Sequence, residues 1–409
     1  MILADLPLSD QLVVLVGGRG TRLGMLAKDT PKPLMPIDGD RVFLDYFLGS
    51  AARQGFREIL LLAGHFSDQV VARYDNVRVG NARVKVIVEP EPLGTGGAFK
   101  AAMDYLAPSF VGANGDTLFD CNIRAVDHEL QMDPGMMGCL ALREVDDVGR
   151  YGSVAFDGRR VSAFREKDTV SPQRRGHING GIYALRRAAI ERLPDGKSSI
   201  ETDLFPQLAA EGQLGGRTSH GYFLDIGLPE TLEIARRDLP AQKRPALFLD
   251  RDGVINIDKG HVGHIENFEW IEGIVDVIRA ANDAGYAVIV VTNQAGIAKG
   301  YYTEGDVLKL HAHVRDTLLG QGAFVDDFYI CPYHADAVVA RYRIAEHFAR
   351  KPNPGMIFQA ARDHRIDLTR SVLIGDKPSD CEAASAAGVQ SHLFPGGNIQ
   401  AWFAANKIL

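Results

Sequence analysis

Short apolar runs that stop at polar or glycine residues recur along the chain. Residues 11–18 read QLVVLVGG and residues 246–253 read ALFLDRDG. Similar runs are REILLLAGH, ARVKVIVEP and SFVGANGD in the first half, and YAVIVVTNQ and RSVLIGDK in the second. An apolar run of about four to eight residues that ends at a glycine-rich turn is typical of a central strand in a parallel sheet. We therefore expect a buried strand at each of these places.

Helical patterns lie between these runs. Two clear ones read LDYFLGSAARQG and IVDVIRAANDAG, and they end at Gly55 and Gly285. A glycine just after the last helical turn can take the left-handed conformation that ends a helix. Strands that alternate with helices predict α/β domains with parallel sheets.

The length of the chain, 409 residues, indicates two or three domains at about 150 residues each. The segment DLPAQKRPA, residues 238–246, carries two prolines and two basic residues just before a predicted core strand. We therefore predict one domain over residues 1–241 and a second over residues 242–409. Each is long enough to bury its own core.

Composition narrows the class of protein. The chain is 46% hydrophobic, and its 45 basic and 52 acidic side chains give a net charge of -7, whereas nucleic-acid-binding proteins usually have a basic excess. No apolar run approaches the roughly 18 residues of a membrane helix, and the N-terminus lacks the pattern of a secretion signal. The four cysteines are scattered, which favours a reducing compartment over a disulfide scaffold. We expect a cytoplasmic protein without nucleic-acid or membrane partners.

Glycines and arginines follow the first predicted strand in the segment GGRGTRL, residues 17–23. Loops at the carboxyl ends of parallel strands bind ligands, glycines let backbone N–H groups approach phosphate, and arginines supply charge. The segment does not match the P-loop or the dinucleotide-binding pattern. A tight turn between a strand and a helix also needs glycines, so this loop alone does not establish a phosphate-binding site.

Further motifs follow in order: PKPL (31–34), EPLGTGGA (91–98), NGD (114–116), FREK (164–167), NGGIY (179–183) and LDIG (224–227). Proline restricts its own backbone and that of its predecessor, so Lys32, between two prolines, lies on stiff backbone. Together the motifs resemble the sugar-1-phosphate nucleotidyltransferase family over about residues 10–238. The resemblance implies a Rossmann-like domain of the GT-A type with a mixed sheet.

The resemblance also implies roles for these residues. Arg22 and Lys32 would neutralise the phosphates as catalytic cations, and Asp116 and Asp225 would hold Mg²⁺. The reaction joins two anions, a sugar 1-phosphate and an NTP, so positioning and positive charge supply most of the catalysis. The residues implied for binding are Lys167 and Asn179 for the sugar phosphate, and Gly17, Gly18, Gly20, Thr21, Leu93, Gly94, Thr95, Gly96, Gly97, Asn114 and Gly115 for the nucleotide.

Four motifs of the second half also follow in order: DRDG (250–253), TNQ (292–294), RKP (350–352) and GDKPSD (375–380). Three of them lie at the ends of predicted strands. An Asp-x-Asp pair, a threonine, a lysine and a second aspartate pair in this order resemble the haloacid-dehalogenase (HAD) phosphohydrolase superfamily. The short gaps between the motifs leave no room for a cap domain. The resemblance therefore implies a capless HAD-type domain with a parallel α/β sheet.

This second resemblance implies covalent catalysis. Asp250 would attack phosphorus, and Asp252 would protonate the leaving alkoxide and then activate water. Thr292 and Lys351 would hydrogen-bond or neutralise the transferring phosphoryl group. Asp376 would bind Mg²⁺ with Asp250 and the backbone carbonyl of Asp252. The remaining implied residues are Asn293 and Arg350 for the sugar phosphate, and Asp380 as a support of the metal.

The residues that flank these motifs indicate which group of the superfamily the second half resembles. The segments DRDGVIN, TNQAGIAKGYY, CPYH, RKPNPGM and IGDKPSD resemble heptose-bisphosphate and histidinol-phosphate phosphatases. Members usually hold a structural zinc with a Cys-x-His pair and a Cys-x-Cys pair just before RKP. Here the pairs read Cys331-Pro332-Tyr333 and His347-Phe348-Ala349, so only Cys331 stands at its implied position. His334 and His347 could be substitute ligands, but a closed site needs four. We expect no structural zinc.

The two resemblances together predict consecutive steps. A heptose 1,7-bisphosphate would lose its 7-phosphate, and the heptose 1-phosphate would then receive a nucleotidyl group, with guanylyl favoured because the GDP-linked heptose branch uses a transferase of this type. The expected ligands are an NTP, a sugar 1-phosphate, a sugar bisphosphate and Mg²⁺ in both domains. A mannose- or other hexose-1-phosphate transferase fused to a sugar-phosphate phosphatase remains open, as do an inactive sugar-phosphate-binding regulator and a homo-oligomer.

Overall fold

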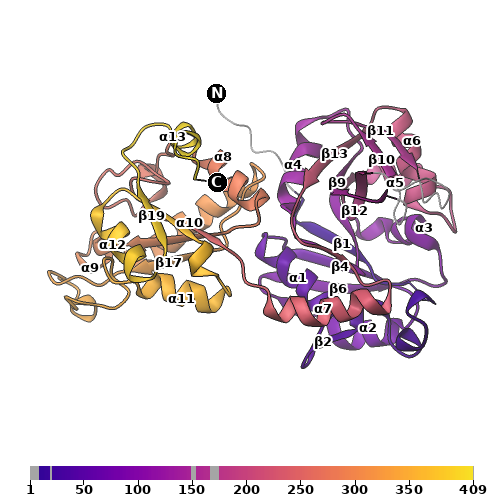
Figure 1. Ribbon diagram of the computed structural model, residues 1–409, viewed down its shortest axis with the longest axis horizontal. Coiled ribbons are helices and arrows are strands. Elements are labelled where there is room, and N and C mark those ends of the chain that lie inside the picture. Colours follow the sequence, from indigo (N-terminus) through magenta and orange to yellow (C-terminus); the bar gives the residue numbers. More distant parts are fainter. Residues whose placement is uncertain (1–8, 19–20, 149–152, 166–174, 409) are drawn as a thin grey trace. The chain divides into compact units, whose positions relative to one another are not determined.

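Two sheets organise the chain, one in each half. The computed structural model describes residues 9–18, 21–148, 153–165 and 175–408. The chain divides into two compact units, residues 1–241 and 242–409, and each has its own sheet (Figure 1). Each unit also has its own apolar core.

The first unit is built around a mixed sheet. Its strands are β1 (Gln11–Leu15), β2 (Pro36–Asp38), β3 (Arg41–Val42), β4 (Glu58–Ala63), β5 (Arg78–Val79), β6 (Ala82–Val88), β7 (Ser109–Asn114), β8 (Thr117–Phe119), β9 (Gly138–Val145), β10 (Ser153–Phe156), β11 (Val161–Arg165), β12 (Gly176–Arg186), β13 (Leu214–Ser219) and β14 (Phe223–Asp225). The main sheet has the order β11-β10-β12-β7-β1-β4-β6-β5, and β9 and β13 continue it beside β12. Strands β7, β1, β4 and β6 are parallel, whereas β12 is antiparallel to both β7 and β9.

Helices cover both faces of this sheet. They are α1 (Phe43–Arg53), α2 (Ser67–Tyr74), α3 (Gly94–Ala101), α4 (Ile123–Met132), α5 (Arg187–Glu191), α6 (Phe205–Ala210) and α7 (Pro229–Ala241), with the short helices η1 (Thr21–Ala27), η2 (Lys32–Leu34), η3 (Met103–Tyr105) and η5 (Ile200–Leu204). Side chains alternate across β1, so Leu12 and Val14 contribute to the core under α1, α2, α4 and α7, and Val13 to the core under α3, α5 and α6.

The second unit has a wholly parallel sheet of order β17-β16-β15-β18-β19. Its elements are β15 (Ala246–Leu249), η6 (Ile265–Asn267), α8 (Ile274–Asp283), β16 (Ala287–Asn293), α9 (Ala295–Ala298), α10 (Glu304–Leu319), β17 (Asp327–Cys331), η7 (Ala340–Tyr342), α11 (Gly355–Asp363), η8 (Leu368–Arg370), β18 (Val372–Gly375), α12 (Pro378–Ala386), β19 (Gln390–Leu393) and α13 (Ile399–Asn406). Leu247 and Leu249 of β15 face the core shared with α8, α10 and α13, and Phe248 faces the core shared with α11 and α12.

The predicted elements are confirmed. Every apolar run named from the sequence is a strand, and Gly55 (φ 84°) and Gly285 (φ 80°) follow helices in the left-handed conformation. Helix α7 continues through Pro240 to Ala241, so the extended connection is confined to residues 242–245 instead of the whole of 238–246.

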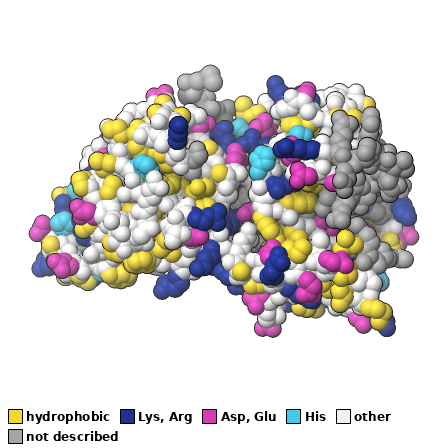
Figure 2. Space-filling view, in the orientation of Figure 1, with side chains coloured by type: hydrophobic (Ala, Val, Ile, Leu, Met, Phe, Trp, Pro, Cys, Tyr) yellow, Lys and Arg dark blue, Asp and Glu magenta, His cyan; other side chains and the backbone are white. Residues whose placement is uncertain are grey.

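The surface mixes both signs of charge. On the face seen in Figure 2, Lys and Arg side chains are interspersed with Asp and Glu side chains in each unit. Among the helices that the structure describes, none is long and apolar enough to cross a membrane.

Two candidate active sites

The first candidate site lies at the carboxyl ends of β1 and β7. These strands are parallel neighbours, and Leu15 of β1 pairs with Asn114 of β7. A cavity of about 220 Å³ opens beside them, and its lining includes five of the residues predicted from the sequence. Its lining residues are Leu15, Val16, Gly18, Lys32, Pro33, Thr95, Asn114 and Asp116.

Lys32 and Asp116 supply the charges of this cavity. Lys32 begins the short helix η2, directly after Pro31, and only 7% of it is exposed. Its Nζ lies 3.3 Å from Oδ2 of Asp116. An ammonium group has three donors, so Lys32 can bind a phosphate oxygen while it keeps this ion pair.

Asp116 and Asp225 are brought together by the small sheet of β8 and β14. Asp225 pairs with Thr117, and the N–H of Ile226 donates to the carbonyl of Asp116 at 3.0 Å. Two carboxylates that are distant in the sequence therefore start from adjacent backbone. Carboxylate oxygens are the usual ligands of Mg²⁺, so both residues have the chemistry of the implied metal site, although Asp116 lines the cavity and Asp225 is not among its lining residues.

Tyr183 fixes the position of Asn114. The Tyr183 hydroxyl donates to Oδ1 of Asn114 at 3.2 Å, and its ring is fully buried. Burial raises the pKa of Tyr183 well above its usual range, so the hydroxyl stays protonated and remains a donor. Tyr183 belongs to the NGGIY motif, but its sequence position alone gave it no assigned role.

The glycines of NGGIY make a bulge in β12. The register between β12 and β9 shifts between Asn179 and Tyr183, and Oδ1 of Asn179 accepts the N–H of Gly181 at 3.0 Å. A Cβ on Gly180 would clash with the ring of Phe119. The bulge thus lets β12 pass close to β8, although Asn179 itself does not line the cavity.

The glycines of LGTGG allow this segment to pack closely against the backbone of Ser198. The N–H groups of Gly96 and Gly97 both donate to the carbonyl of Ser198, at 2.9 and 3.3 Å. A Cβ on Gly94, which has φ +74°, would lie 2.5 Å from the same carbonyl oxygen. Of this predicted set, Thr95 lines the cavity, and its hydroxyl donates to Oε2 of Glu201 at 2.6 Å.

The second candidate site lies at the carboxyl ends of β15, β16 and β18. A cavity of about 480 Å³ collects residues from all four motifs of this half. The predicted residues that line it are Asp250, Asp252, Thr292, Asn293, Arg350, Lys351 and Asp380. The other lining residues are Asp258, Gly260, His261, Ala295, Tyr302, Pro352, Lys377 and Ser379.

Lys351 is the centre of a buried charge cluster. Its Nζ lies 2.8 Å from Oδ1 of Asp250 and 2.6 Å from Oδ1 of Asp380, and it donates to the carbonyl of Val291 at 2.8 Å. Burial alone would lower the pKa of Lys351, but the two carboxylates outweigh it and raise this pKa above its ordinary value. The ammonium is therefore charged, as the predicted neutralisation of a phosphoryl group requires.

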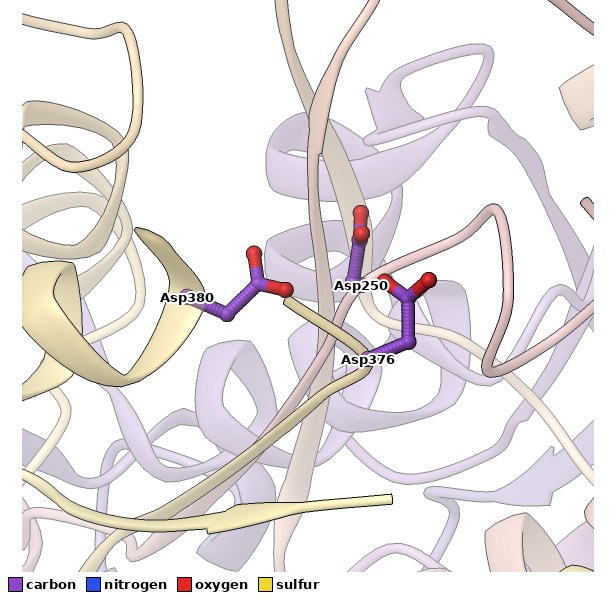
Figure 3. A group of neighbouring side chains, drawn as sticks. All are labelled: Asp250, Asp376 and Asp380. Carbon is purple, nitrogen blue, oxygen red and sulfur yellow. The ribbon is translucent and has the colours of Figure 1, made fainter. Parts of the chain in front are cut away.

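Three carboxylates converge beside Lys351. One oxygen from each of Asp250, Asp376 and Asp380 lies within 4.8 Å of the others, and Figure 3 shows the three side chains turned toward the same space. Oδ1 of Asp376 is buried with no hydrogen-bond partner in the described part of the chain. Burial raises the pKa of Asp376 to about 6, and the negative charges of Asp250 and Asp380 act in the same direction. The cluster therefore fits a divalent cation that would screen these charges.

Asp252 is held separately from this cluster. Arg251, which is fully buried, donates from Nη2 to both oxygens of Asp252 at 2.9 Å. Asn256 and Gln294 donate to the same carboxylate at 3.0 Å each, and Gln294 also donates to Oγ1 of Thr292 at 2.9 Å. Asp252 is thus oriented by three side chains, as a general acid and base requires.

The implied zinc loop does not gather ligands. Cys331 is fully buried in the apolar core, and Nδ1 of His334 and of His347 each accept a backbone N–H. Among the described residues, the aspartates 250, 376 and 380 are the group that brings three or more ligand atoms together. The residues of this loop therefore do not fit a four-ligand zinc site.

Comparison with known proteins identifies both halves. The nucleotidyl transferase family model matches residues 11–242, which is more than half of the chain. The chain belongs to the nucleotidyl transferase family. A HAD-hydrolase-like model matches residues 348–404. Members of both families generally use Mg²⁺ and act on small molecules.

Relatives of the second half are phosphatases. The D-glycero-beta-D-manno-heptose-1,7-bisphosphate 7-phosphatase of Rhodopseudomonas palustris is 49% identical over 160 residues, which cover 39% of this chain and 88% of the relative. The D-glycero-alpha-D-manno-heptose-1,7-bisphosphate 7-phosphatase of Burkholderia mallei is 49% identical over 151 residues, with 37% and 79% covered. The second half of the chain belongs to this phosphatase family.

Among solved structures, HddC from Yersinia pseudotuberculosis is 35% identical, covers 55% of this chain and 97% of its own, and has a TM-score of 0.49. The family matches show that the chain joins a nucleotidyltransferase to a HAD-type phosphatase, so it is an enzyme of both kinds. The mixed sheet followed by a parallel sheet is the architecture that the two resemblances implied.

Some predicted residues of the transferase lie outside the described part of the chain. These are Gly20 and Lys167, and the side chains of Thr21 and Arg22. In the phosphatase, sequence reasoning missed the supports of Asp252. The signal was available, because Arg251, Asn256 and Gln294 all lie inside the DRDGVIN and TNQ segments.

Proposed function

We propose that this chain carries out two steps of GDP-heptose biosynthesis. The phosphatase half, residues 242–409, would remove the 7-phosphate of D-glycero-D-manno-heptose 1,7-bisphosphate. The transferase half, residues 1–241, would then transfer a guanylyl group from GTP to heptose 1-phosphate. The observation that carries the proposal is that both charge clusters, around Lys32 and around Lys351, are assembled in one chain.

The order of the two steps follows from their chemistry. Removal of the 7-phosphate leaves the 1-phosphate, which is the nucleophile that the transferase needs. The curated relatives of the phosphatase half are named for heptose 1,7-bisphosphates of both anomers, which supports the substrate class without deciding the anomer. We place both reactions in the cytoplasm, where nucleoside triphosphates are made.

In the phosphatase, a carboxylate oxygen of Asp250 attacks the 7-phosphorus and the bond to the sugar oxygen breaks. Asp252 gives its proton to the departing alkoxide. Asp252 then takes a proton from water, the water oxygen attacks the aspartyl-phosphate, and inorganic phosphate leaves as the carboxylate of Asp250 is restored. Lys351 and Thr292 line the same cavity and bind the phosphoryl oxygens.

The carboxylate clusters suit Mg²⁺ in both halves. Asp250, Asp376 and the backbone carbonyl of Asp252 would hold it in the phosphatase, and Asp116 and Asp225 in the transferase. When bound, Mg²⁺ supplies the positive charge that lets an anionic substrate approach these carboxylates. Asp380 supports the cluster through its ion pair with Lys351.

In the transferase, an oxygen of the sugar 1-phosphate attacks the α-phosphorus of the NTP. The bond to the β-phosphate breaks and pyrophosphate leaves, so no covalent enzyme intermediate forms. Lys32 lies in the cavity with Gly18, Thr95 and Asn114, where it can neutralise the charge that develops on the phosphates.

A nucleotide panel tests the transferase. The protein is incubated with Mg²⁺, each of the four NTPs, and heptose 1-phosphate or mannose 1-phosphate, and pyrophosphate is measured. We expect GTP and heptose 1-phosphate to give the highest kcat/KM. Preference for mannose 1-phosphate would replace the proposed substrate, and no turnover with any pair would favour an inactive regulator.

Phosphate release tests the other half. Heptose 1,7-bisphosphate should lose one phosphate, and NMR of the product should show that the 1-phosphate remains. Asp250→Asn should abolish this release and leave pyrophosphate formation intact, whereas Asp116→Asn should do the opposite. The paired variants control for each other, and activity that survives Asp250→Asn would remove Asp250 as the nucleophile.

A further inference from the structure

Two aromatic rings are stacked in the segment between β17 and α11. The ring centroids of Tyr333 and His347 lie 3.9 Å apart, with an angle of 15° between their planes. Tyr342 meets Tyr333 edge-on at 5.9 Å, and its hydroxyl donates to Oε1 of Glu304 on α10 at 2.6 Å. The stack is thus anchored to a helix of the phosphatase unit.

Both members of the stack hold Arg350. Nη1 of Arg350 donates to the carbonyl of Tyr333 at 2.9 Å, and its backbone N–H donates to the carbonyl of His347 at 2.9 Å. Asn353 donates to the same His347 carbonyl at 3.0 Å. Arg350 lines the phosphatase cavity beside Lys351. The backbone carbonyls of both stacked residues therefore hold a residue whose side chain lines the active-site cavity.

The position of the stack in the sequence is informative. Tyr333 ends the first of the two pairs at which the resemblance implied zinc ligands, and His347 begins the second. A zinc ion there would tie these two places together. The residues present do not fit such an ion, and instead the two rings meet face to face at the same two places.

We infer that the Tyr333–His347 stack replaces a metal as the brace that positions Arg350 in the phosphatase cavity. Arginine has a long flexible side chain, so fixing it in advance removes part of the entropy loss on substrate binding. Tyr333 and His347 are positioning residues, because they act through Arg350 and do not line the cavity. The inference rests on the proposed phosphatase activity but not on the identity of the sugar.

A double-mutant cycle in the full chain tests this inference. The variants are His347→Ala, His347→Phe, Arg350→Ala and the His347→Ala/Arg350→Ala pair, with exposed His313→Ala as a matched control. The readouts are kcat and KM for p-nitrophenyl phosphate and for heptose 1,7-bisphosphate, and the dissociation constant for inorganic phosphate by calorimetry. The generic ester and inorganic phosphate keep the test valid if the heptose proposal fails.

We expect His347→Ala to raise KM or the phosphate dissociation constant about twofold to tenfold, as for the loss of one aromatic pair, with kcat nearly unchanged. His347→Phe keeps a ring for the stack but not the Nδ1 that accepts the N–H of Ala349, so it should recover most of the wild-type values. His347→Ala should add nothing to Arg350→Ala. Dialysis against a chelator followed by Mg²⁺ should leave activity intact.

Several results would overturn the inference. They are additive effects of the two alanine substitutions, a His347→Phe variant as impaired as His347→Ala, an Arg350→Ala variant with unchanged binding, or one tightly bound zinc per chain. If His347→Ala does not fold, His347→Leu, which keeps an apolar side chain without the ring, takes its place in the cycle.

Discussion

Nζ of Lys351 lies 2.6 Å from Oδ1 of Asp380, and both side chains are almost fully buried. The other oxygen of Asp380 accepts the N–H of Lys377 at 3.0 Å and so caps the start of α12. Asp380 therefore connects the first turn of a helix to the lysine that contacts Asp250, the proposed nucleophile. We therefore expect this one carboxylate to matter for both stability and activity.

Asp380→Asn should destabilise the phosphatase unit by about 3 kcal/mol, because removal of one partner leaves a buried charge poorly compensated. Lys351 keeps its ion pair with Asp250, so we expect the loss of stability to be no larger than this value. Both tryptophans of the chain, Trp270 and Trp402, lie in this unit. Urea unfolding followed by tryptophan fluorescence therefore reports this unit specifically.

Asp276→Asn is the matched control for this substitution. Asp276 pairs with Arg279 at 3.2 Å on the surface of α8, and such exposed pairs contribute about 0.5 kcal/mol or less. We expect no measurable loss of phosphatase activity from the control. Equal destabilisation by both substitutions would contradict the role given to the buried cluster.

His311 should make the phosphatase unit sensitive to acid. Burial lowers the pKa of His311 to about 3, and the positive charges of Arg251 and Arg315 act in the same direction. The unfolded chain takes up a proton near pH 6.5, whereas the folded chain does not until about pH 3. The stabilisation is therefore fully present above pH 6.5 and is lost as the pH falls toward 3, by up to about 1.4 kcal/mol per pH unit.

His311→Gln should flatten this dependence, because a glutamine oxygen can accept from Arg251 without titrating. Tryptophan-monitored urea unfolding at a series of pH values between 7 and 4 would measure the slope of the free energy of unfolding for each variant. His313→Gln, on the exposed face of the same helix, is the control and should keep the wild-type slope. An unchanged slope in His311→Gln would show that other titrating groups determine the pH dependence of the free energy of unfolding.

Gly94→Ala should impair the transferase. A side chain at Gly94 would require a left-handed residue at φ +74° and would place Cβ 2.5 Å from the carbonyl oxygen of Ser198. Strain of this kind amounts to about 1–3 kcal/mol, and the movement that relieves it would displace Thr95 from the cavity. We expect a higher KM for the NTP in the pyrophosphate assay, with phosphatase activity unchanged.

Gly212→Ala separates the strain of the left-handed conformation from the contact with Ser198. Gly212 is also left-handed, with φ +67°, but a Cβ there meets no atom within 4 Å. It should share the conformational strain, seen as a lower melting temperature of the first unit, and keep the wild-type KM. If both variants raise KM equally, the contact with Ser198 is not the cause of the higher KM.

The sequence predicted the central strands and the residues that meet at their ends. The Asp-x-Asp pair follows β15, Thr292 lies at the end of β16, and Lys351 lies in the loop before α11. Parallel strands bring the ends of β15 and β16 to one edge of the sheet. Asp116 and Asp225 are brought together by β8 and β14, which have three residues each and are too short to be predicted from an apolar run. Only the resemblance to a family joined those two residues before the structure did.

The remaining features depend on tertiary contacts that a linear pattern does not encode. The hydrogen bond from Tyr183 to Asn114 requires the register of β12 beside β7, and the brace behind Arg350 requires two rings from opposite ends of a long segment. Glycines were easy to find but hard to interpret. The glycines of LGTGG are predicted to lie against a nucleotide, and in the structure Gly96 and Gly97 also donate to the carbonyl of Ser198, a contact that the sequence pattern does not reveal.

Arg251→Lys should reduce kcat of the phosphatase and leave its KM nearly unchanged. Nη2 of Arg251 donates to both oxygens of Asp252, Nε donates to Oδ1 of Asp252 at 3.2 Å, and Nη1 lies 3.3 Å from Nε2 of His311. A lysine is a single point donor that cannot reproduce these contacts. Asp252 would then lose its fixed orientation toward the leaving oxygen, and small misplacements of this kind reduce rates by about tenfold to a hundredfold.

The same chain supplies the controls for this prediction. Transferase activity should stay at the wild-type level, and tryptophan fluorescence should confirm that the phosphatase unit is folded. Arg315→Lys, next to the same core but without contact to Asp252, should keep kcat within about twofold, as expected for a substitution away from the reacting atoms. A rise in KM with unchanged kcat in Arg251→Lys would instead assign Arg251 to substrate binding. A loss of kcat shared by Arg315→Lys would point to general disruption of the core around His311.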